Sequence, residues 1–408
     1  WVKQIDLKDQ YFGTEIEMTG ISRYDAAVAI GRMFGTEPYH IRSYDSWCVK
    51  DSDGKTWKFS RDSSIDCERL ANGTVIDADG DYSTEMVSPK LEYSEMGKLQ
   101  EVVRCVKNAG AFVNSSCGMH VHVDASNHTP RSLKNALTIM YCKEDILFKA
   151  LNVQTRREDE YCQKVRPMVL EKIRRMPNST ITMEKFKRAW YEGNDGSSEH
   201  YNWTRYYALN LHAVFSKGTL EWRCFESTLH AGKVRSNITL ALAISAQAIN
   251  QSCTHAKKTE IGDNPAFTFR TFLLRLGLIG DEYKNVRKHL LANLDGDKAW
   301  RTKVPMPVCR IQDGQMMRDN RIMRTDRPGG NIRLFLCKMK KKKKEVENMK
   351  SKYRFRRILS GVMAAVTILS TVISPLTVYA SEEPKAAEPP AYESVKDQLD
   401  ENEVVKAT

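Results

Sequence analysis

The sequence contains ten cysteines among its 408 residues, but no two of them form a C-x-x-C pair. They are scattered from Cys48 to Cys337. Structural zinc sites require paired ligands, and small secreted scaffolds have dense, regularly spaced cysteines, so neither class is indicated. The pattern favours reduced thiols in a domain that faces the cytosol.

Two phosphate-binding loops are also missing. The sequence has no G-x-x-x-x-G-K-[ST] segment and no G-x-G-x-x-G segment. Both loops bind phosphate through glycine-rich backbone at the start of a helix. A nucleotide that binds this chain therefore binds by other means.

The body of the chain lacks a strong excess of positive charge, although the formal net charge is +12. Residues 338–357 hold eleven basic side chains against two acidic ones, whereas residues 381–408 hold eight acidic side chains against three lysines. The rest is only mildly basic. That balance suits an anionic substrate such as a nucleotide, and we expect no nucleic-acid partner.

Residues 358–380 have no charged side chain. The run is long enough to cross a bilayer once, with the preceding basic residues holding its N-terminal side in the cytoplasm. It also resembles a signal peptide that starts at Met349 and ends before Ser381, which would indicate a fused neighbouring reading frame. Both interpretations leave residues 1–337 in the cytoplasm.

A chain of this length is expected to form more than one folding unit. We predict a catalytic domain over 1–255 and a helical extension over 256–337 that packs on it. A basic linker (338–357), a transmembrane or signal-like segment (358–380) and a disordered acidic tail (381–408) follow.

Strand-like and helix-like segments alternate irregularly in the first 255 residues. Alternation of apolar and polar residues predicts strands, and apolar residues at helical spacing predict helices. The expected strands are 11–19, 46–50, 56–60, 82–88, 118–124 and a pair within 205–226, and the expected helices are 24–34, 93–109, 130–151 and 233–251, with 156–200 a polar mixture of helix and loop. Because the strands arrive as hairpins, the fold class is α+β with an antiparallel sheet.

Acidic residues recur two apart on the first strand. Glu15 and Glu17 point to one face of it, where two like charges require a cation or an arginine between them. Carboxylate oxygens on a rigid strand suit Mg²⁺. A solvent-facing strand with ordinary acids is the alternative, and Glu85, on another strand, is ambiguous in the same way.

Imidazoles follow the same spacing on a later strand. His120, His122 and Asp124 share one face, opposite Met119 and its apolar neighbours. Such a face is unfavourable unless its groups are paired or ligated, and imidazole can ligate a metal or bond a phosphate. A hydrogen-bonded polar strand face is the simpler explanation.

A carboxylate and a guanidinium share a face near residue 222. Glu221 and Arg223 form either a plain ion pair or a metal ligand beside a phosphate clamp. Arg205 and Asn210 are expected on the strand before it. Asp62 and Ser64, which close the hairpin at 46–60, could contact a nucleotide or a substrate, or could simply form a turn.

Taken together and in order, these segments resemble the amidoligase family, which is related to the glutamate–cysteine ligase and glutamine synthetase superfamily. The resemblance covers about residues 8–255. The segments that carry it are Gly13-Thr14-Glu15-Ile16-Glu17, Asp62-Ser63-Ser64, Thr84-Glu85-Met86-Val87-Ser88-Pro89, Gly118-Met119-His120-Val121-His122-Val123 and Thr219-Leu220-Glu221-Trp222-Arg223-Cys224-Phe225-Glu226. The sequence departs from the family at Ser63, where glycine is expected.

The resemblance implies a glutamine-synthetase-like antiparallel sheet, curled into a partial barrel with flanking helices, that holds ATP and Mg²⁺ or Mn²⁺. It implies phosphorylation of a substrate carboxylate and displacement of the phosphate by an amine, with small molecules, peptides or proteins as substrates. The metal ligands it implies are Glu15, Glu17, Glu85, His120 and Glu221; the catalytic residues are Glu85, Arg205 and Arg223; and the nucleotide contacts are Asp62, Ser64, His122, Asn210 and Arg223.

Two other functions fit some of these residues. His120, His122 and a glutamate could hold zinc or manganese in a hydrolase. Alternatively, residues 1–337 could act only as a membrane-anchored binding scaffold. Three or more separate glutamates and Arg223 favour the ligase over the hydrolase, and the paired polar faces disfavour a pure scaffold.

Overall fold

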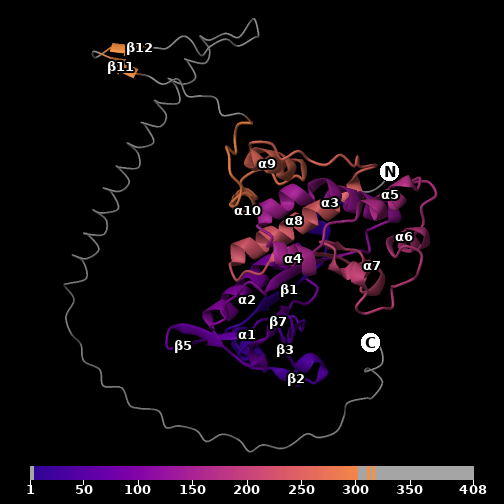
Figure 1. The fold of residues 1–408 in the computed structure, drawn as a ribbon. Coiled ribbons are helices and arrows are strands. Elements are labelled where there is room, and N and C mark those ends of the chain that lie inside the picture. The colour runs from indigo at the N-terminus through magenta and orange to yellow at the C-terminus, as the bar shows by residue number, and fades with distance from the viewer. Residues whose placement is uncertain (1–3, 302–309, 313–314, 318–408) are drawn as a thin grey trace, which may run out of the picture. The chain divides into compact units, whose positions relative to one another are not determined.

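The computed structural model describes residues 4–301, 310–312 and 315–317 (Figure 1). Elements within 4–301 form one compact unit, and the last six described residues belong to a second. The predicted basic linker, apolar segment and acidic tail lie outside the described residues. Within the described ranges, no helix has both the length and the apolarity needed to span a membrane.

A large antiparallel sheet forms the centre of the first unit. Its order is β2-β3-β4-β7-β1-β8-β10-β9, and every neighbouring pair is antiparallel. The strands are β1 (Phe12–Met18), β2 (Tyr39–Ile41), β3 (Ser46–Lys50), β4 (Thr56–Ser60), β7 (Thr84–Val87), β8 (Gly118–Asp124), β9 (Leu209–Asn210) and β10 (Thr219–Glu226). Because β2 and β9 are not paired with each other, the described strands form an open sheet and no closed barrel.

Helices pack against this sheet, so the predicted α+β class is confirmed (Figure 1). The helices are α1 (Arg23–Phe34), α2 (Met96–Asn108), α3 (Pro130–Leu151), α4 (Thr155–Glu160), α5 (Pro167–Arg175), α6 (Met183–Trp190), α7 (His212–Ser216), α8 (Ala231–Asn250), α9 (Pro265–Arg275) and α10 (Lys284–Leu290). Two separate hairpins pair β5 (Glu68–Ala71) with β6 (Thr74–Asp77) and β11 (Arg310–Gln312) with β12 (Gln315–Met317).

Strand alternation gives the large sheet one apolar face and one polar face. Trp57, Ile16, Met119 and Trp222 are fully buried and belong to one core cluster with residues of α1, α2, α3 and α8. Helix α8 is buried almost all round because it contacts α2, α3, α10 and the sheet. The helices therefore cover the apolar face, and the polar face of the sheet is left for a site.

Local signals define the ends of the main helices. The Ser22 side chain accepts the Asp25 amide at the start of α1, and Gly35 ends this helix with φ 72°. Thr129 caps α3 ahead of Pro130. The predicted helices over 24–34 and 130–151 are therefore confirmed.

Helices α9 and α10 pack on the sheet-covering helices. Helix α10 contacts α8, and α9 contacts α3. The Asn293 side chain donates to the Ala150 carbonyl (3.0 Å), and Lys8 pairs with Glu282 (2.7 Å). The helical character expected after residue 256 is present in the described part of that segment, whereas the boundary at 255 stays a prediction.

The predicted strand pair within 205–226 is wrong in its first half. Arg205 lies in a 3-10 turn (Trp203–Tyr206), β9 has only two residues, and His212 begins α7. The reason is local: the Asn210 side chain accepts the Ala213 amide (3.3 Å), which favours a helical turn over a continued strand. Arg205 and Asn210 therefore do not lie on one strand.

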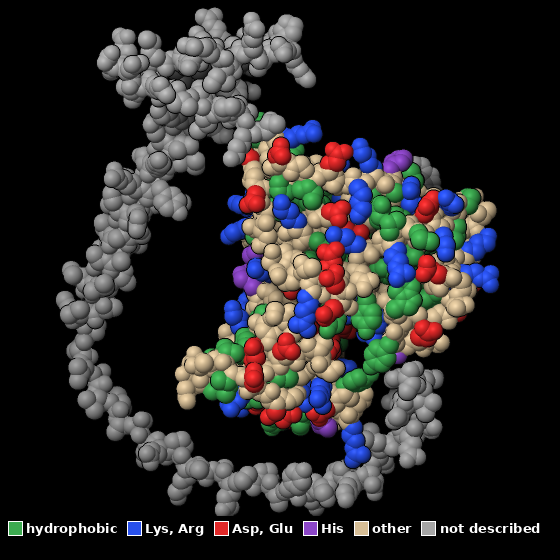
Figure 2. Space-filling model, in the orientation of Figure 1, with side chains coloured by type: hydrophobic (Ala, Val, Ile, Leu, Met, Phe, Trp, Pro, Cys, Tyr) green, Lys and Arg blue, Asp and Glu red, His purple; other side chains and the backbone are tan. Residues whose placement is uncertain are grey.

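The outer surface carries charges of both signs. On the face of the described unit that Figure 2 shows, Lys and Arg side chains are interspersed with Asp and Glu. This face has the mixed charge typical of a globular protein.

Candidate active site

The strand register brings the predicted polar residues together. Glu17 lies opposite Glu85 across β1 and β7, and Glu15 lies opposite His120 across β1 and β8. Glu221 on β10 lies opposite His122. Residues directly opposite on antiparallel strands point to the same face, so all these side chains gather on the polar face of the sheet.

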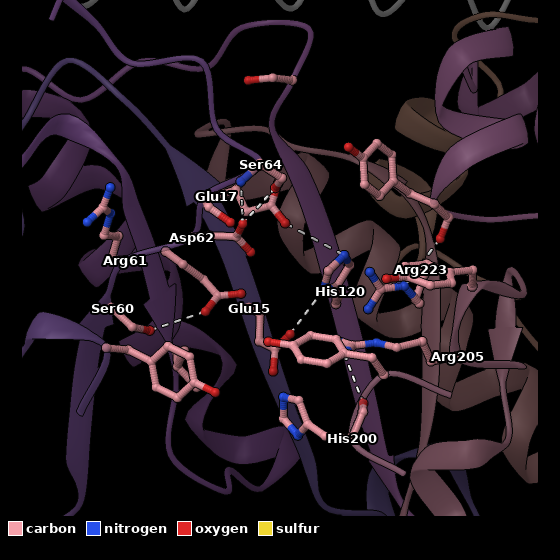
Figure 3. A pocket seen from close by; sticks show the side chains of 18 of the residues that line it. Glu15, Glu17, Ser60, Arg61, Asp62, Ser64, His120, His200, Arg205 and Arg223 are labelled. Atoms are coloured by element: carbon pink, nitrogen blue, oxygen red, sulfur yellow. Dashed lines mark hydrogen bonds and ion pairs between the residues drawn. The ribbon is translucent and has the colours of Figure 1, made fainter. Parts of the chain in front are cut away.

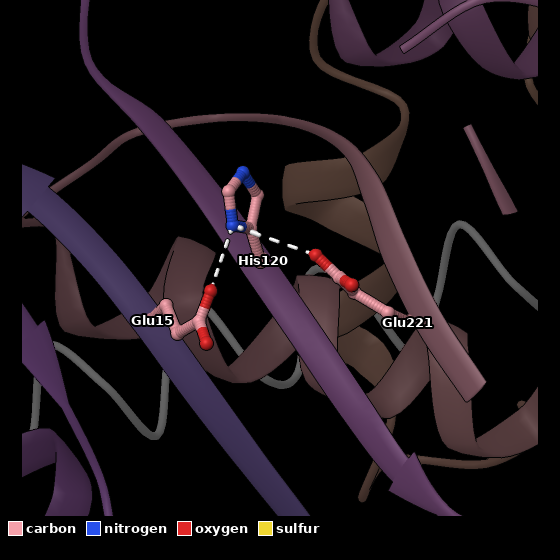
Figure 4. Close-up of side chains that lie close together, drawn as sticks. All are labelled: Glu15, His120 and Glu221. Carbon is pink, nitrogen blue, oxygen red and sulfur yellow. Dashed lines mark hydrogen bonds and ion pairs between the residues drawn. The ribbon is translucent and has the colours of Figure 1, made fainter. Parts of the chain in front are cut away.

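One cluster joins three strands through His120 (Figure 4). His120 Nδ1 lies 2.9 Å from a Glu15 oxygen and 3.7 Å from a Glu221 oxygen. Each of the three side chains offers a ligand atom, and the three atoms lie within 4.8 Å of one another. The cluster has the composition and spacing of a divalent cation site.

A second cluster uses the other side of the same imidazole. His120 Nε2 lies 3.8 Å from a Glu17 oxygen, and Glu17, Glu85 and His120 again offer ligand atoms within 4.8 Å. The other Glu17 oxygen accepts the Gly118 amide (2.5 Å), and Glu85 accepts the Ser60 hydroxyl (3.2 Å). Two candidate cation positions therefore share His120.

The pKa values of two carboxylates in these clusters are shifted in opposite directions. Burial opposes ionisation of Glu15, but His122 and His120 hold its pKa well below the ordinary value. Burial, together with Glu15 and Glu17, raises the pKa of Glu85 well above the ordinary value. A divalent cation would relieve this repulsion, so the residues present fit Mg²⁺ or Mn²⁺.

Glu221 is held rigidly beside the first cluster. Its two oxygens accept Asn210 Nδ2 and Arg223 Nη1, both at 2.6 Å. Burial opposes its ionisation, yet Arg223, His122 and His120 lower the pKa of Glu221 to about 2. This carboxylate is therefore ionised over the whole physiological range.

A cavity of about 740 Å³ lies in front of the clusters (Figure 3). The predicted residues that line it are Glu15, Glu17, Asp62, Ser64, Glu85, His120, Arg205 and Arg223. Basic side chains line it as well: Lys58, Arg61, Arg157, Arg205, Lys217 and Arg223. Carboxylates at the base with several cations around them suit a ligand that carries both phosphates and a metal ion.

The remaining predicted residues do not line this cavity. Asn210 and Glu221 are buried beside it, so Asn210 acts by holding Glu221. His122 bonds Thr219 (3.0 Å), approaches Glu15 (3.3 Å) and lines a smaller, more apolar cavity of about 220 Å³. That smaller cavity lies at the Asp124 end of β8.

Two predicted contacts are partly engaged within the protein. The Asp62 carboxylate accepts both the amide (2.8 Å) and the hydroxyl (2.7 Å) of Ser64, so the turn interpretation is correct, although both residues also line the cavity. Arg205 donates to the His200 carbonyl (3.1 Å) and lies 5.4 Å from the centre of the Tyr201 ring. Its guanidinium reaches the cavity from the loop before β9.

A one-residue bulge in β10 places one more carboxylate on this face. The pairing with β8 shifts between Trp222 and Phe225, so Glu226 faces the same side as Glu221. Its carboxylate accepts the Gln154 amide (3.1 Å), and burial raises its pKa. Glu226 lies outside the lining of the main cavity, at the end of the strand.

The sequence patterns missed several lining residues. Lys58 could have been found, because it alternates with Ser60 on a predicted strand whose inner face carries the site. Lys217 lies in the short turn between α7 and β10. Arg157 and Tyr161, with His200, Tyr201 and Tyr206, come from a polar stretch with no periodic signal, and only tertiary packing brings them to the cavity.

The open antiparallel sheet presents carboxylates, imidazole and guanidinium groups to one cavity, an arrangement that suits an enzyme acting on a ligand with a metal ion and phosphates. A comparison with protein families is more specific: the family described as putative amidoligase enzyme matches residues 8–245, more than half of the chain. The chain belongs to this family, as its motifs predicted. Membership makes it an amide-forming ligase in the general sense. A search of curated proteins found no match.

Proposed function

We propose that this protein is an ATP- and Mg²⁺-dependent carboxylate–amine ligase that forms an amide through an acyl phosphate. Its substrates are an amino acid, a peptide or a protein side chain. The observation that carries the proposal is the pair of carboxylate clusters that share His120 at the base of a cation-lined cavity. The glutamine-synthetase-like sheet, curled into a partial barrel, belongs to the same proposal.

Five side chains would hold the divalent cations: Glu15, Glu17, Glu85, His120 and Glu221. Mg²⁺ or Mn²⁺, when bound, supplies neutralisation of the phosphate charge. Among the described residues, each candidate group holds a single histidine, and carboxylate oxygens outnumber nitrogens in both. That donor set suits a hard oxygen-seeking cation better than a two-histidine zinc site, so the ligase is favoured over the hydrolase.

Arginines would handle the transferring phosphoryl group. Arg223 is buried, is oriented by Glu221 and by the Tyr161 carbonyl (3.3 Å), and reaches the cavity. Arg205 approaches the cavity from the loop before β9. Asp62, Ser64 and His122 are proposed nucleotide contacts, and Asn210 contributes by fixing Glu221.

The chemistry balances without a protein nucleophile. A substrate carboxylate oxygen attacks the terminal phosphorus of ATP, and ADP leaves; the amine then attacks the acyl carbon, and inorganic phosphate leaves. Phosphoryl transfer depends mainly on positioning and charge neutralisation, which this face offers. The amine must lose a proton, and Glu85, whose pKa is raised, is the proposed acceptor.

The setting of the enzyme is part of the proposal. The catalytic part is cytoplasmic, and no nucleic acid takes part. A pure binding scaffold is disfavoured, because buried carboxylates that repel one another lower stability without benefit to a scaffold.

The direct test uses the purified full-length chain with ATP, Mg²⁺ and a panel of carboxylates and amines. We expect ADP release that requires both substrates, and hydroxamate formation when hydroxylamine replaces the amine. Glu17→Gln and Arg223→Ala should each reduce turnover by about a hundredfold or more while the fold is kept. The matched controls are Glu101→Gln and Arg175→Ala, at exposed helix positions.

Three results would contradict the proposal. ATP-independent hydrolysis of an amide would favour the hydrolase. Turnover at the wild-type rate in Glu17→Gln or Arg223→Ala would remove the roles given to those residues. If the protein binds Mg-ATP but releases no ADP with any substrate pair, the binding scaffold would be the remaining candidate function.

A further inference from the structure

Arg157 is a buried cation for which the proposed phosphoryl transfer assigns no role. It belongs to α4, only 5% of its surface is exposed, and it lines the main cavity. One guanidinium nitrogen, Nη2, donates to the Arg223 carbonyl (3.2 Å), whereas Nε is buried without a hydrogen-bond partner among the described residues. Within the same residues, no carboxylate oxygen lies within 4.0 Å of it.

A buried guanidinium without a counter-ion is unfavourable unless a ligand supplies one. Glu226 is the nearby carboxylate on the same sheet face, but it is engaged by the Gln154 amide instead. The backbone leaves room for the guanidinium itself, since a Cβ on Gly118 would lie 2.0 Å from Arg157 Nη2. The fold therefore accommodates an unpaired cation at this position.

A second cavity is also lined by Arg157. It has a volume of about 300 Å³, and its lining is Ser64, Ser115, Ser116, Gln154, Thr155, Arg156, Arg157 and Tyr161. Four of these residues, Ser64, Ser116, Arg157 and Tyr161, also line the main cavity, so the two spaces meet at Arg157. Hydroxyl groups around a single buried guanidinium suit a small anion such as a carboxylate.

This cavity lies beside the main cavity, near the Gly118 end of β8. Arg157 lies against Gly118 at the start of β8, whereas the more apolar cavity, with Lys217 and His122, lies at the other end of the same strand. The clusters around His120 lie between the two ends. Without Arg157, five cations of the main cavity remain for a polyphosphate: Lys58, Arg61, Arg205, Lys217 and Arg223. The hydroxyl-lined end is then left for a substrate.

We propose that Arg157 and this hydroxyl-lined cavity bind a carboxylate that the reaction does not consume, carried by one of the two substrates. The inference rests on the proposed ligase function and narrows its substrates to molecules that keep a free carboxylate in the product. That group belongs either to an acyl donor with two carboxylates or to an amine acceptor of the amino acid type.

Binding to the full-length chain, measured by calorimetry with Mg²⁺ and a non-hydrolysable ATP analogue, tests this directly. Glutarate against butyrate tests the acyl donor, and alanine against alaninamide tests the amine; each pair differs by one carboxylate. We expect the wild type to prefer the carboxylate-bearing member of one pair. Arg157→Met should weaken that member's affinity by about tenfold to a hundredfold and leave its partner unchanged.

Two controls keep the test independent of folding. Arg175→Met makes the same charge change at an exposed position of α5, and should leave both affinities unchanged. Ser115→Phe fills the second cavity from its exposed rim, with Ser252→Phe as the matched exposed control, and should weaken binding even if Arg157→Met is unstable.

Several outcomes would overturn the inference. One is an equal loss of affinity for both members of a pair in Arg157→Met. Another is a wild type that prefers the carboxylate-bearing member in neither pair. The third is a loss of nucleotide affinity in Arg157→Met, which would mean that Arg157 binds a phosphate. Because the calorimetry measures binding without turnover, a negative result for the carboxylate site can be distinguished from an absence of ligase activity.

Discussion

At the scale of single residues, the site depends on side chains that fix other side chains. Asn210 is not among the lining residues of the three cavities described above, yet its amide donates to Glu221 at 2.6 Å. Partners behind a metal ligand set its orientation, and their loss typically reduces metal affinity without loss of the fold. The arrangement around Glu221 makes this measurable.

Asn210→Ala should weaken Mn²⁺ binding by about tenfold to a hundredfold. Asn250→Ala, which removes an amide that only ties down the backbone of Ile5, should leave Mn²⁺ affinity unchanged. Calorimetric titration of both variants measures the difference. Equal Mn²⁺ affinity in Asn210→Ala and wild type would show that Glu221 is not a ligand or needs no support.

His128 lies in a buried polar network away from the cavities. Its ring nitrogens bond Ser132 (3.0 Å) and Ser245 (2.9 Å), and burial lowers its pKa to about 4. In the unfolded chain the imidazole gains its proton near pH 6.5, whereas in the folded chain it does so only near pH 4. Stability is therefore full above pH 6.5 and falls as the pH drops towards 4.

The loss should be about 2–3 kcal/mol between pH 6.5 and 4 for this group. Urea unfolding of His128→Gln over that range should show a shallower fall in the free energy of unfolding than the wild type. His255→Gln, at an exposed histidine, should keep the wild-type slope. Parallel slopes for His128→Gln and wild type would show that the imidazole is not held neutral.

At the scale of elements, the turn between β1 and α1 tests how tightly the sheet and helices are joined. Gly20 has φ +81°, and a Cβ there would lie 2.3 Å from the Phe112 ring and 2.8 Å from the Gly110 carbonyl. Gly35, at the other end of α1, has φ +72° and open space around it. The two glycines share a left-handed backbone and differ in crowding.

Gly35→Ala should lower the free energy of unfolding by about 1 kcal/mol, the backbone penalty alone. Gly20→Ala adds overpacking and should lower it by about 3 kcal/mol or more. Denaturant unfolding of both variants gives the comparison. Equal losses would mean that the contact with the Phe112 ring relaxes freely.

Sequence patterns predicted most of the elements that carry the site. Alternation located β1, β7, β8 and β10, and cap residues located α1 and α3, because these signals are local. The hairpin β5–β6 was missed although Asn72-Gly73 is a strong turn signal, and both residues have positive φ.

The remaining failures have two causes, one local and one that depends on contacts between distant segments. The strand expected before β10 is a two-residue strand followed by a helix, because the Asn210 side chain accepts the Ala213 amide of that helix while it also donates to Glu221. Arg157 and Tyr161 reach the site because α4 packs against the β10 bulge. Arg157 donates to the Arg223 carbonyl, and Arg223 donates to the Tyr161 carbonyl. No spacing in the sequence encodes that contact.

At the scale of the whole molecule, stability and ligand binding should oppose each other at the carboxylate face. Glu85 faces Glu15 and Glu17 in a half-buried position, and its raised pKa means that ionisation destabilises the folded, metal-free protein. This loss of stability is absent below the ordinary pKa of a glutamate, grows as the pH rises towards the raised pKa, and is constant above it. A protein that accepts such repulsion trades stability for binding.

Glu85→Gln removes the charge, so the metal-free variant should melt about 2–4 °C above the metal-free wild type at pH 8, with a smaller gap at pH 5. Adding Mn²⁺ should raise the melting temperature of the wild type and reverse the order, because the variant has lost a ligand and gains less stabilisation from the cation. Glu101→Gln, at an exposed position on α2, should follow the wild type under all conditions. If Glu85→Gln melts lower than wild type in chelator at pH 8, the carboxylates do not repel one another in the free protein, and the need for cations at this face loses its physical basis.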